Sequence, residues 1–124
     1  MTQEEKQLLL KDLCARVPYG VKILDIPANV VGNLFLVSTT DTVEYETNNS
    51  VGSQTLYNIK PHLRPLSSMT EEEENEYRAI NCYEGLFPRN EDALDYVLSH
   101  HLDFRGLIPM GLALEAPEGM YKTE

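Results

Sequence analysis

The sequence contains little of what marks secreted, disulfide-stabilised and membrane-spanning proteins. It has no tryptophan and only two cysteines, Cys14 and Cys82, which are far apart and show neither CxxC nor CxxH spacing. We therefore expect both thiols to be reduced and buried in the core of a cytoplasmic protein, with a disulfide or a metal pair as the less favoured alternative. No hydrophobic run approaches the roughly 18 residues of a membrane span, and the N-terminus lacks the basic region of a signal peptide. These absences predict a protein that neither enters a membrane nor is exported.

Basic residues are also scarce. Ten lysines and arginines stand against twenty aspartates and glutamates, which gives a net charge of -10 at pH 7. This charge repels phosphate backbones and anionic lipids at long range, so direct nucleic-acid binding is disfavoured. The same acidity leaves open an acidic DNA mimic that inhibits a host nucleic-acid-binding protein. The run Glu71 to Glu74, with Glu76, could contribute to such a surface, but a helix start stabilised by the helix dipole explains most of it without any function.

Motifs for catalysis and cofactor binding are missing as well. The sequence has no glycine-rich phosphate loop, no GxSxG motif and no metal-ligand spacing among its three histidines and two cysteines. We therefore expect no cofactor and no metal. At 124 residues, of which 42% are hydrophobic, the chain is long enough for one globular domain with a packed core, which we assign to residues 1–124.

The first predicted helix begins with a capping box. Thr2 and Glu5 have the spacing at which a hydroxyl and a carboxylate satisfy backbone N–H groups at a helix start. The helix should end at Pro18-Tyr19-Gly20, and Asp12 is expected on its solvated face. The opposite face should be an apolar stripe at helical spacing, made of Leu10, Leu13, Cys14 and Val17.

The segment that follows has the composition of strands. Short runs rich in Val, Ile, Leu, Tyr and Thr alternate with turn residues such as Asn48-Asn49-Ser50. The connections are too short for parallel crossovers, so an antiparallel sheet that curls towards a partial barrel is expected. Pro61 and Pro65 then favour an ordered turn. The predicted strands cover Val21–Ile26, Asn33–Thr39, Thr42–Thr47 and Gln54–Lys60.

Two more helices are predicted in the second half of the chain. Thr70 and Glu73 repeat the capping-box spacing, so we expect a helix from about residue 70 to 83, and Asn90 is the N-cap of a helix that runs to about His101. The chain after residue 102 has too many glycines and prolines for a long helix, but its apolar residues predict an ordered, docked tail. The fold class is therefore α+β: an N-terminal helix, a small antiparallel sheet or partial barrel of about four strands, two C-terminal helices and a docked tail.

The densest group of polar residue types runs from Ser99 to Gly106. Within it, His101 and Asp103 are candidates for the chemistry of a small hydrolase or metal enzyme, because a histidine beside a carboxylate can act as a general base or bind a metal. His100 and His101 are adjacent, so on a helix they point about 100° apart and cannot both bind one ion. The simpler interpretation is a helix C-terminus, where histidine meets the negative end of the helix dipole.

Two arginines lie in unusual surroundings. Arg64 and Arg105 are flanked by prolines, a glycine and apolar residues rather than by polar ones. In such places a guanidinium usually bonds backbone carbonyls or a carboxylate and so holds irregular chain in place. We predict that Arg64, Asp103 and Arg105 belong to a structural motif, in which Asp103 bonds nearby backbone or an arginine. If the segments that carry them are exposed instead, these residues become candidates for an interaction surface.

Two stretches resemble a known family. Residues 59–73, IKPHLRPLSSMTEEE, resemble the KPxLRPLSSMTxEE segment of small uncharacterised proteins of Bacteroides-type phages and prophages. Residues 101–108 and 111–117 resemble the HxDYRGLIxxGLAxxAP ending of those proteins, with Phe104 in place of the tyrosine. The resemblance implies a mobile-element protein in the cytoplasm of a bacterial host cell. It implies no activity and no functional residues.

Protein binding is the function that these observations favour. Small size, acidity and the missing catalytic motifs indicate a non-enzymatic phage or prophage accessory protein that acts by protein–protein binding. The alternatives are the acidic DNA mimic and the small hydrolase or metal enzyme that would use His101 and Asp103. The expected partner is a protein, with no direct nucleic-acid contact and no membrane.

Overall fold

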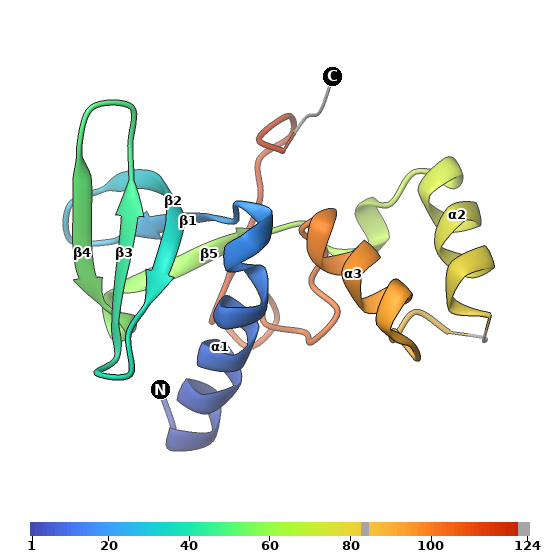
Figure 1. Cartoon of the computed structure of the whole chain (residues 1–124), viewed down its shortest axis with the longest axis horizontal. Helices are drawn as coiled ribbons and strands as arrows, with labels where there is room; N and C mark the ends of the chain where they lie inside the picture. The colour runs from blue at the N-terminus through green and yellow to red at the C-terminus, as the bar shows by residue number, and fades with distance from the viewer. Residues whose placement is uncertain (83–84, 122–124) are drawn as a thin grey trace.

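Six strands form one sheet in the computed structural model, which describes residues 1–82 and 85–121 (Figure 1). The strands are β1 (Lys22–Asp25), β2 (Val30–Val37), β3 (Thr42–Glu46), β4 (Val51–Thr55), β5 (Ile59–Leu63) and β6 (Leu114–Glu115). Their order in the sheet is β4-β3-β2-β1-β5-β6. All neighbours are antiparallel except β5 and β6, which are parallel.

Within the described residues, three helices accompany the sheet. They are α1 (Gln3–Arg16), α2 (Glu71–Asn81) and α3 (Glu91–Ser99), and the short 3-10 turns are η1 (Val17–Tyr19), η2 (Leu56–Asn58) and η3 (Leu66–Ser68). Both predicted capping boxes are confirmed, and Asn90 caps α3 as predicted. The predicted α+β class is therefore confirmed, whereas residue 83 of the second predicted helix and residues 122–124 of the predicted tail lie outside the described residues. None of the three helices is long and apolar enough to cross a membrane.

The sheet has more strands than predicted because the expected strand Gln54–Lys60 is divided between β4 and β5, and because β6 forms within the predicted tail. The turn η2 separates β4 from β5 and buries Leu56 completely in the core. This turn takes the chain from the edge of the sheet to the far side of β1 in only three residues. The sheet must therefore curl, and the amide of Gln54 donates to Asp25 Oδ1 at 3.1 Å across the curl.

Pro61 lies inside β5, where the sequence predicts a turn. It is opposite Ile23 in a pair that exchanges no backbone hydrogen bonds, because the bonded pairs alternate and Ile26 N–H donates to the Asn58 carbonyl at 2.9 Å. The N–H that a proline lacks would point away from β1 at this position. The strand therefore accepts Pro61 without losing a hydrogen bond to β1. Pro65 lies in irregular chain, directly before η3.

The face that α1 buries differs from the predicted stripe. Asp12 is buried rather than solvated, and Cys14 is exposed. Three consecutive leucines at residues 8–10 allow the apolar stripe to be drawn in more than one phase, so the pattern alone does not select the buried face. Cys82 is also exposed, so the prediction of two core cysteines is wrong. The buried residues of α1 are Leu9, Asp12, Leu13 and Arg16.

The buried hydrophobic residues form two clusters. One lies between α1, the sheet and the tail, which contributes Leu107, Leu112 and Ala113. The other lies between α2, α3 and the chain after α3. Figure 1 accordingly shows α2 and α3 at one end of the molecule, β2 to β4 at the other, and α1 between them. The predicted docking of the tail is confirmed, because its leucines enter the first cluster and β6 pairs with β5.

Tyr45 fixes the position of β4 in the sheet. Its ring lies against the backbone of Gly32 on one neighbouring strand and Gly52 on the other, where an added Cβ would overlap ring atoms. Its hydroxyl donates to Asp25 Oδ2 at 2.6 Å, and Gln54 binds the other oxygen of the same carboxylate. Both positions require glycine because the Tyr45 ring approaches the backbone too closely for a Cβ atom. The buried ring thus holds β4 on its inner side.

Candidate functional site

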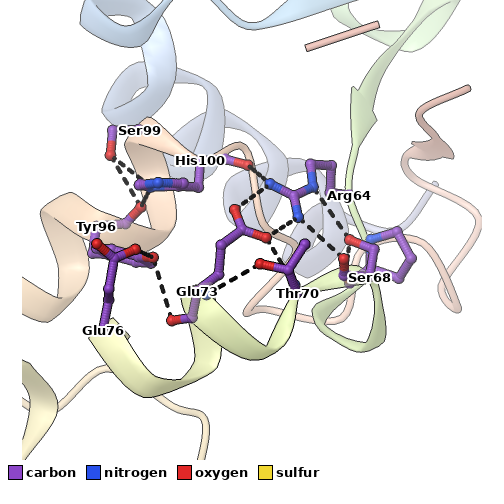
Figure 2. Close-up of polar contacts among 9 residues, drawn as sticks. Arg64, Ser68, Thr70, Glu73, Glu76, Tyr96, Ser99 and His100 are labelled. Atoms are coloured by element: carbon purple, nitrogen blue, oxygen red, sulfur yellow. Dashed lines mark hydrogen bonds and ion pairs between the residues drawn. The ribbon is translucent and has the colours of Figure 1, made fainter. Parts of the chain in front are cut away.

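Arg64, which directly follows β5, contacts several segments of the chain in the polar cluster of Figure 2. Its guanidinium forms two hydrogen bonds with the Glu73 carboxylate, Nη2 to Oε1 at 2.7 Å and Nη1 to Oε2 at 2.9 Å. It also donates to the hydroxyl and the carbonyl of Ser68, each at 3.2 Å, and to the carbonyl of His100 at 3.4 Å. This arginine therefore joins η3, the start of α2 and the end of α3.

The contact with Arg64 alters the titration of Glu73. Hydrogen bonds from the guanidinium, together with the Thr70 N–H at 2.9 Å, stabilise the carboxylate and lower the pKa of Glu73 to about 2. The same carboxylate completes the capping box of α2. The backbone of Arg64 adds two further bonds, from its N–H to the His101 carbonyl at 2.7 Å and from the Asp103 N–H to its carbonyl at 2.8 Å.

His101 and Asp103, the predicted catalytic candidates, bind different partners. The buried carboxylate of Asp103 accepts hydrogen bonds from the N–H groups of Leu107 at 2.8 Å and Ile108 at 2.9 Å. The ring of His101 stacks on Tyr121 with 3.8 Å between the ring centroids, and burial near positive charges lowers its pKa to about 4. Its Nδ1 atom has no hydrogen-bond partner among the described residues. The structure thus does not bring the imidazole and the carboxylate together as a hydrogen-bonded pair.

Arg105 shares a buried carboxylate with an arginine of α1. Asp12 binds Arg16 Nε at 2.7 Å through one oxygen and Arg105 Nε at 3.0 Å through the other. Arg16 is fully buried and also donates to the Leu102 carbonyl at 2.7 Å, and the Phe104 ring packs against both guanidiniums. Sequence reasoning missed this group because it placed Asp12 on the solvated face. The i, i+4 spacing of Asp12 and Arg16 was the available signal.

The free edge of the sheet is formed by β4. In an antiparallel pair, residues that bond the neighbouring strand alternate with residues whose backbone groups point away from it. Two hydrogen bonds fix this alternation between β3 and β4: Thr47 N–H to the Ser50 carbonyl and Leu56 N–H to the Asp41 carbonyl, both at 2.8 Å. The residues whose backbone groups then point to the open edge are Val51, Ser53 and Thr55.

This edge offers hydrogen-bonding groups and little protection. The N–H of Thr55 is bound by Oε1 of Gln54 at 2.9 Å. In the part of the chain that the structure describes, the N–H and C=O groups of Val51 and Ser53 have no partner. β4 contains no proline, no lysine and no other charged residue, the devices that usually block edge strands. The other edge of the sheet is β6, which is only two residues long.

Sequence reasoning missed this edge because it merged part of β4 with β5. A signal was present: Val43 to Thr47 alternate strictly, Asn48-Asn49-Ser50 form a turn, and Val51 follows at once, which is the pattern of a hairpin. Such a local pattern does not specify the order of the strands in the sheet. The sequence could therefore have revealed the strand, but not that it lies at the edge.

Neither a cluster of metal ligands among the described residues nor a similarity to a known protein indicates another functional site. Within residues 1–82 and 85–121, no three His, Cys, Asp or Glu side chains lie together as a metal site requires. Arg64, Asp103 and Arg105 all direct their polar groups to other parts of this chain. No family model, curated protein or solved structure is significantly similar to the chain.

Proposed function

We propose that this chain is a non-enzymatic accessory protein of a phage or prophage, and that it binds a protein partner by accepting an extended segment along β4. The single observation that carries the proposal is the open edge of β4, with the unpartnered backbone groups of Val51 and Ser53. In strand addition, main-chain hydrogen bonds to such an edge provide the affinity, and side chains provide the specificity.

The edge is ordered before a partner arrives. β4 is bonded to β3 along its whole length, and Tyr45 lies against Gly52 on its inner side. Gln54 binds Asp25 through its amide nitrogen and the Thr55 N–H through its oxygen. A strand held in this way loses little conformational entropy on binding, which favours association.

The edge also exposes apolar surface beside its backbone groups. Val51, the first residue of β4, is 63% exposed. An added strand would cover part of this apolar surface in addition to the backbone groups. Burial of apolar area supplies the non-directional part of most protein–protein affinity.

The test uses a proline at an edge position. Ser53→Pro removes an N–H that points outward, so it blocks an incoming strand without removing a bond to β3. Ser53→Ala is the matched control because it keeps the backbone. Both variants and the unaltered protein are immobilised and used to capture binding proteins from lysate of a bacterial host, and amide exchange is then measured in the purified complex.

We expect the unaltered protein and Ser53→Ala to capture the same protein and Ser53→Pro to lose it. In the complex, the amides of Val51 and Ser53 should exchange more slowly than in the free chain. A complex that leaves these two amides unprotected, or that forms equally well with Ser53→Pro, contradicts the proposal. Loss of capture on Glu71→Gln and Glu72→Gln, with no effect of Ser53→Pro, would instead favour the acidic DNA mimic.

A further inference from the structure

We infer that the segment accepted by β4 is basic, with a lysine or arginine opposite Ser53 that reaches Glu44. This inference rests on the proposed function and adds the chemistry of the partner. It follows from which side chains share the outer face of the sheet beside the open edge.

The register places two glutamates next to the edge. Residues directly opposite each other in a sheet point to the same face, and Ser53 is opposite Glu44 while Val51 is opposite Glu46. Because Val43 and Tyr45 are buried on the inner face, both glutamates lie on the outer face. A strand added to β4 would therefore have every second side chain on the same face as Glu44 and Glu46.

Ser53 leaves room for a long side chain to cross β4. Opposed side chains on neighbouring strands have Cβ atoms about 5 Å apart, so a partner residue opposite Ser53 would lie about 10 Å from Glu44. That gap is within the combined reach of a lysine or arginine and a glutamate, and the small Ser53 side chain does not obstruct it. The apolar stem of the cation could lie against Val51, which is 63% exposed.

The two glutamates have no cation of their own chain. Among the described residues, neither Glu44 nor Glu46 takes part in an ion pair. Lys22 lies in the same row of the sheet as Glu46, because Asn33 is opposite both residues on its two neighbouring strands. The ammonium group of Lys22 donates to the Asn33 side chain at 2.9 Å. The charge beside the edge is therefore available to a partner of opposite sign.

The same charges argue against a second copy as the occupant. β4 of another chain would bring no basic residue to Glu44 or Glu46, because Val51–Thr55 contains none. Each chain also carries a net charge of -10, which opposes association of two copies. A basic segment of a different protein satisfies both the backbone edge and the glutamates.

Synthetic peptides of one length test the inference. The probe is a nine-residue peptide that alternates lysine with valine, and its partners replace every lysine with glutamine or with glutamate. Binding to the full chain is measured by chemical-shift changes in NMR spectra, at low and high salt. The variants are Ser53→Pro, the double variant Glu44→Gln with Glu46→Gln, and the control Glu71→Gln with Glu72→Gln, which removes the same charge from α2.

We expect the lysine peptide to shift the amides of β4 and to bind about five- to tenfold more weakly to the Glu44→Gln, Glu46→Gln variant, as two partly exposed ion pairs imply. The control variant should bind as the unaltered protein does, and Ser53→Pro should abolish binding. Equal binding of the lysine and glutamine peptides, lost on Ser53→Pro, would overturn the basic partner and leave strand addition intact. Equal weakening by the control variant would overturn the placement of the charge at the edge. A dimer of the free chain that Ser53→Pro dissociates would identify a second copy as the occupant and overturn the inference.

Discussion

Replacement of Arg64 by alanine should remove a defined part of the folding free energy. The contact with Arg64 is the main reason that the pKa of Glu73 falls from 4.5 to about 2. A depression of about 2.5 pH units corresponds to about 3 kcal/mol of stabilisation at neutral pH. The Arg64 and Glu73 side chains are 22% and 16% exposed, so solvent screening reduces the share of the ion pair to about 1–2 kcal/mol.

Arg64→Ala also leaves other groups without a donor. The carbonyls of Ser68 and His100 lose the guanidinium, which adds about 1 kcal/mol because water replaces part of these bonds. We therefore expect Arg64→Ala to lower the free energy of unfolding by about 2–3 kcal/mol at pH 7, measured by urea titration. Glu73→Gln is the comparison variant, since its amide oxygen can still accept the Thr70 N–H of the capping box, and it should cost about 1–2 kcal/mol.

The pH dependence separates this ion pair from a general packing defect. The folded pKa of Glu73 lies below the unfolded value, so its contribution is present above about pH 4.5 and is lost as the pH falls towards 2. The difference in stability between the unaltered protein and Arg64→Ala should therefore shrink over this range. A difference that stays constant from pH 7 to pH 2, or a variant within 0.5 kcal/mol of the unaltered protein at pH 7, would refute the reasoning.

Three further outcomes are expected. Asp103→Asn should lower the free energy of unfolding in urea by about 1–3 kcal/mol, because an amide nitrogen cannot accept one of the two backbone N–H groups that the carboxylate binds; unchanged stability would contradict this. Gly52→Ala should lower the melting temperature by displacing the Tyr45 ring, whereas Ser53→Ala on the same strand should leave it unchanged. His101 has its pKa lowered to about 4 by burial, so it should destabilise the fold increasingly from about pH 6.5 down to pH 4, by up to about 3 kcal/mol, and urea titrations of His101→Phe should lack that slope.

Some parts of the fold follow from residues close together in the sequence. The capping boxes of Thr2 with Glu5 and Thr70 with Glu73 depend on groups three residues apart, and both form as the spacing predicts. The N-cap Asn90 is of the same kind. The antiparallel pairing of β1 to β4 follows from connections too short for a parallel crossover. These signals are local, so the rest of the fold does not alter them.

Other parts depend on what each element packs against. Leu8, Leu9 and Leu10 permit several buried faces for α1, and the sheet selects the one that also buries Asp12 and Arg16. In the sequence, Asp12 and Arg16 have the pattern of a charged pair on a solvated helix face. In the fold, Arg105, which is 93 residues from Asp12 along the chain, binds the same carboxylate. The pattern in the sequence does not contain that third partner.

By itself, the sequence determined where the helices begin, that β1 to β4 pair antiparallel, and that the chain is acidic. The tertiary structure alone decided that the candidate pair His101 and Asp103 is divided between separate contacts, and that β4 lies at the edge of the sheet. The physical reason is the separation along the chain of the groups that interact. Caps and turns are made by groups within a few residues of one another. Strand order and the partners of buried charges are set by contacts between segments that the sequence keeps far apart.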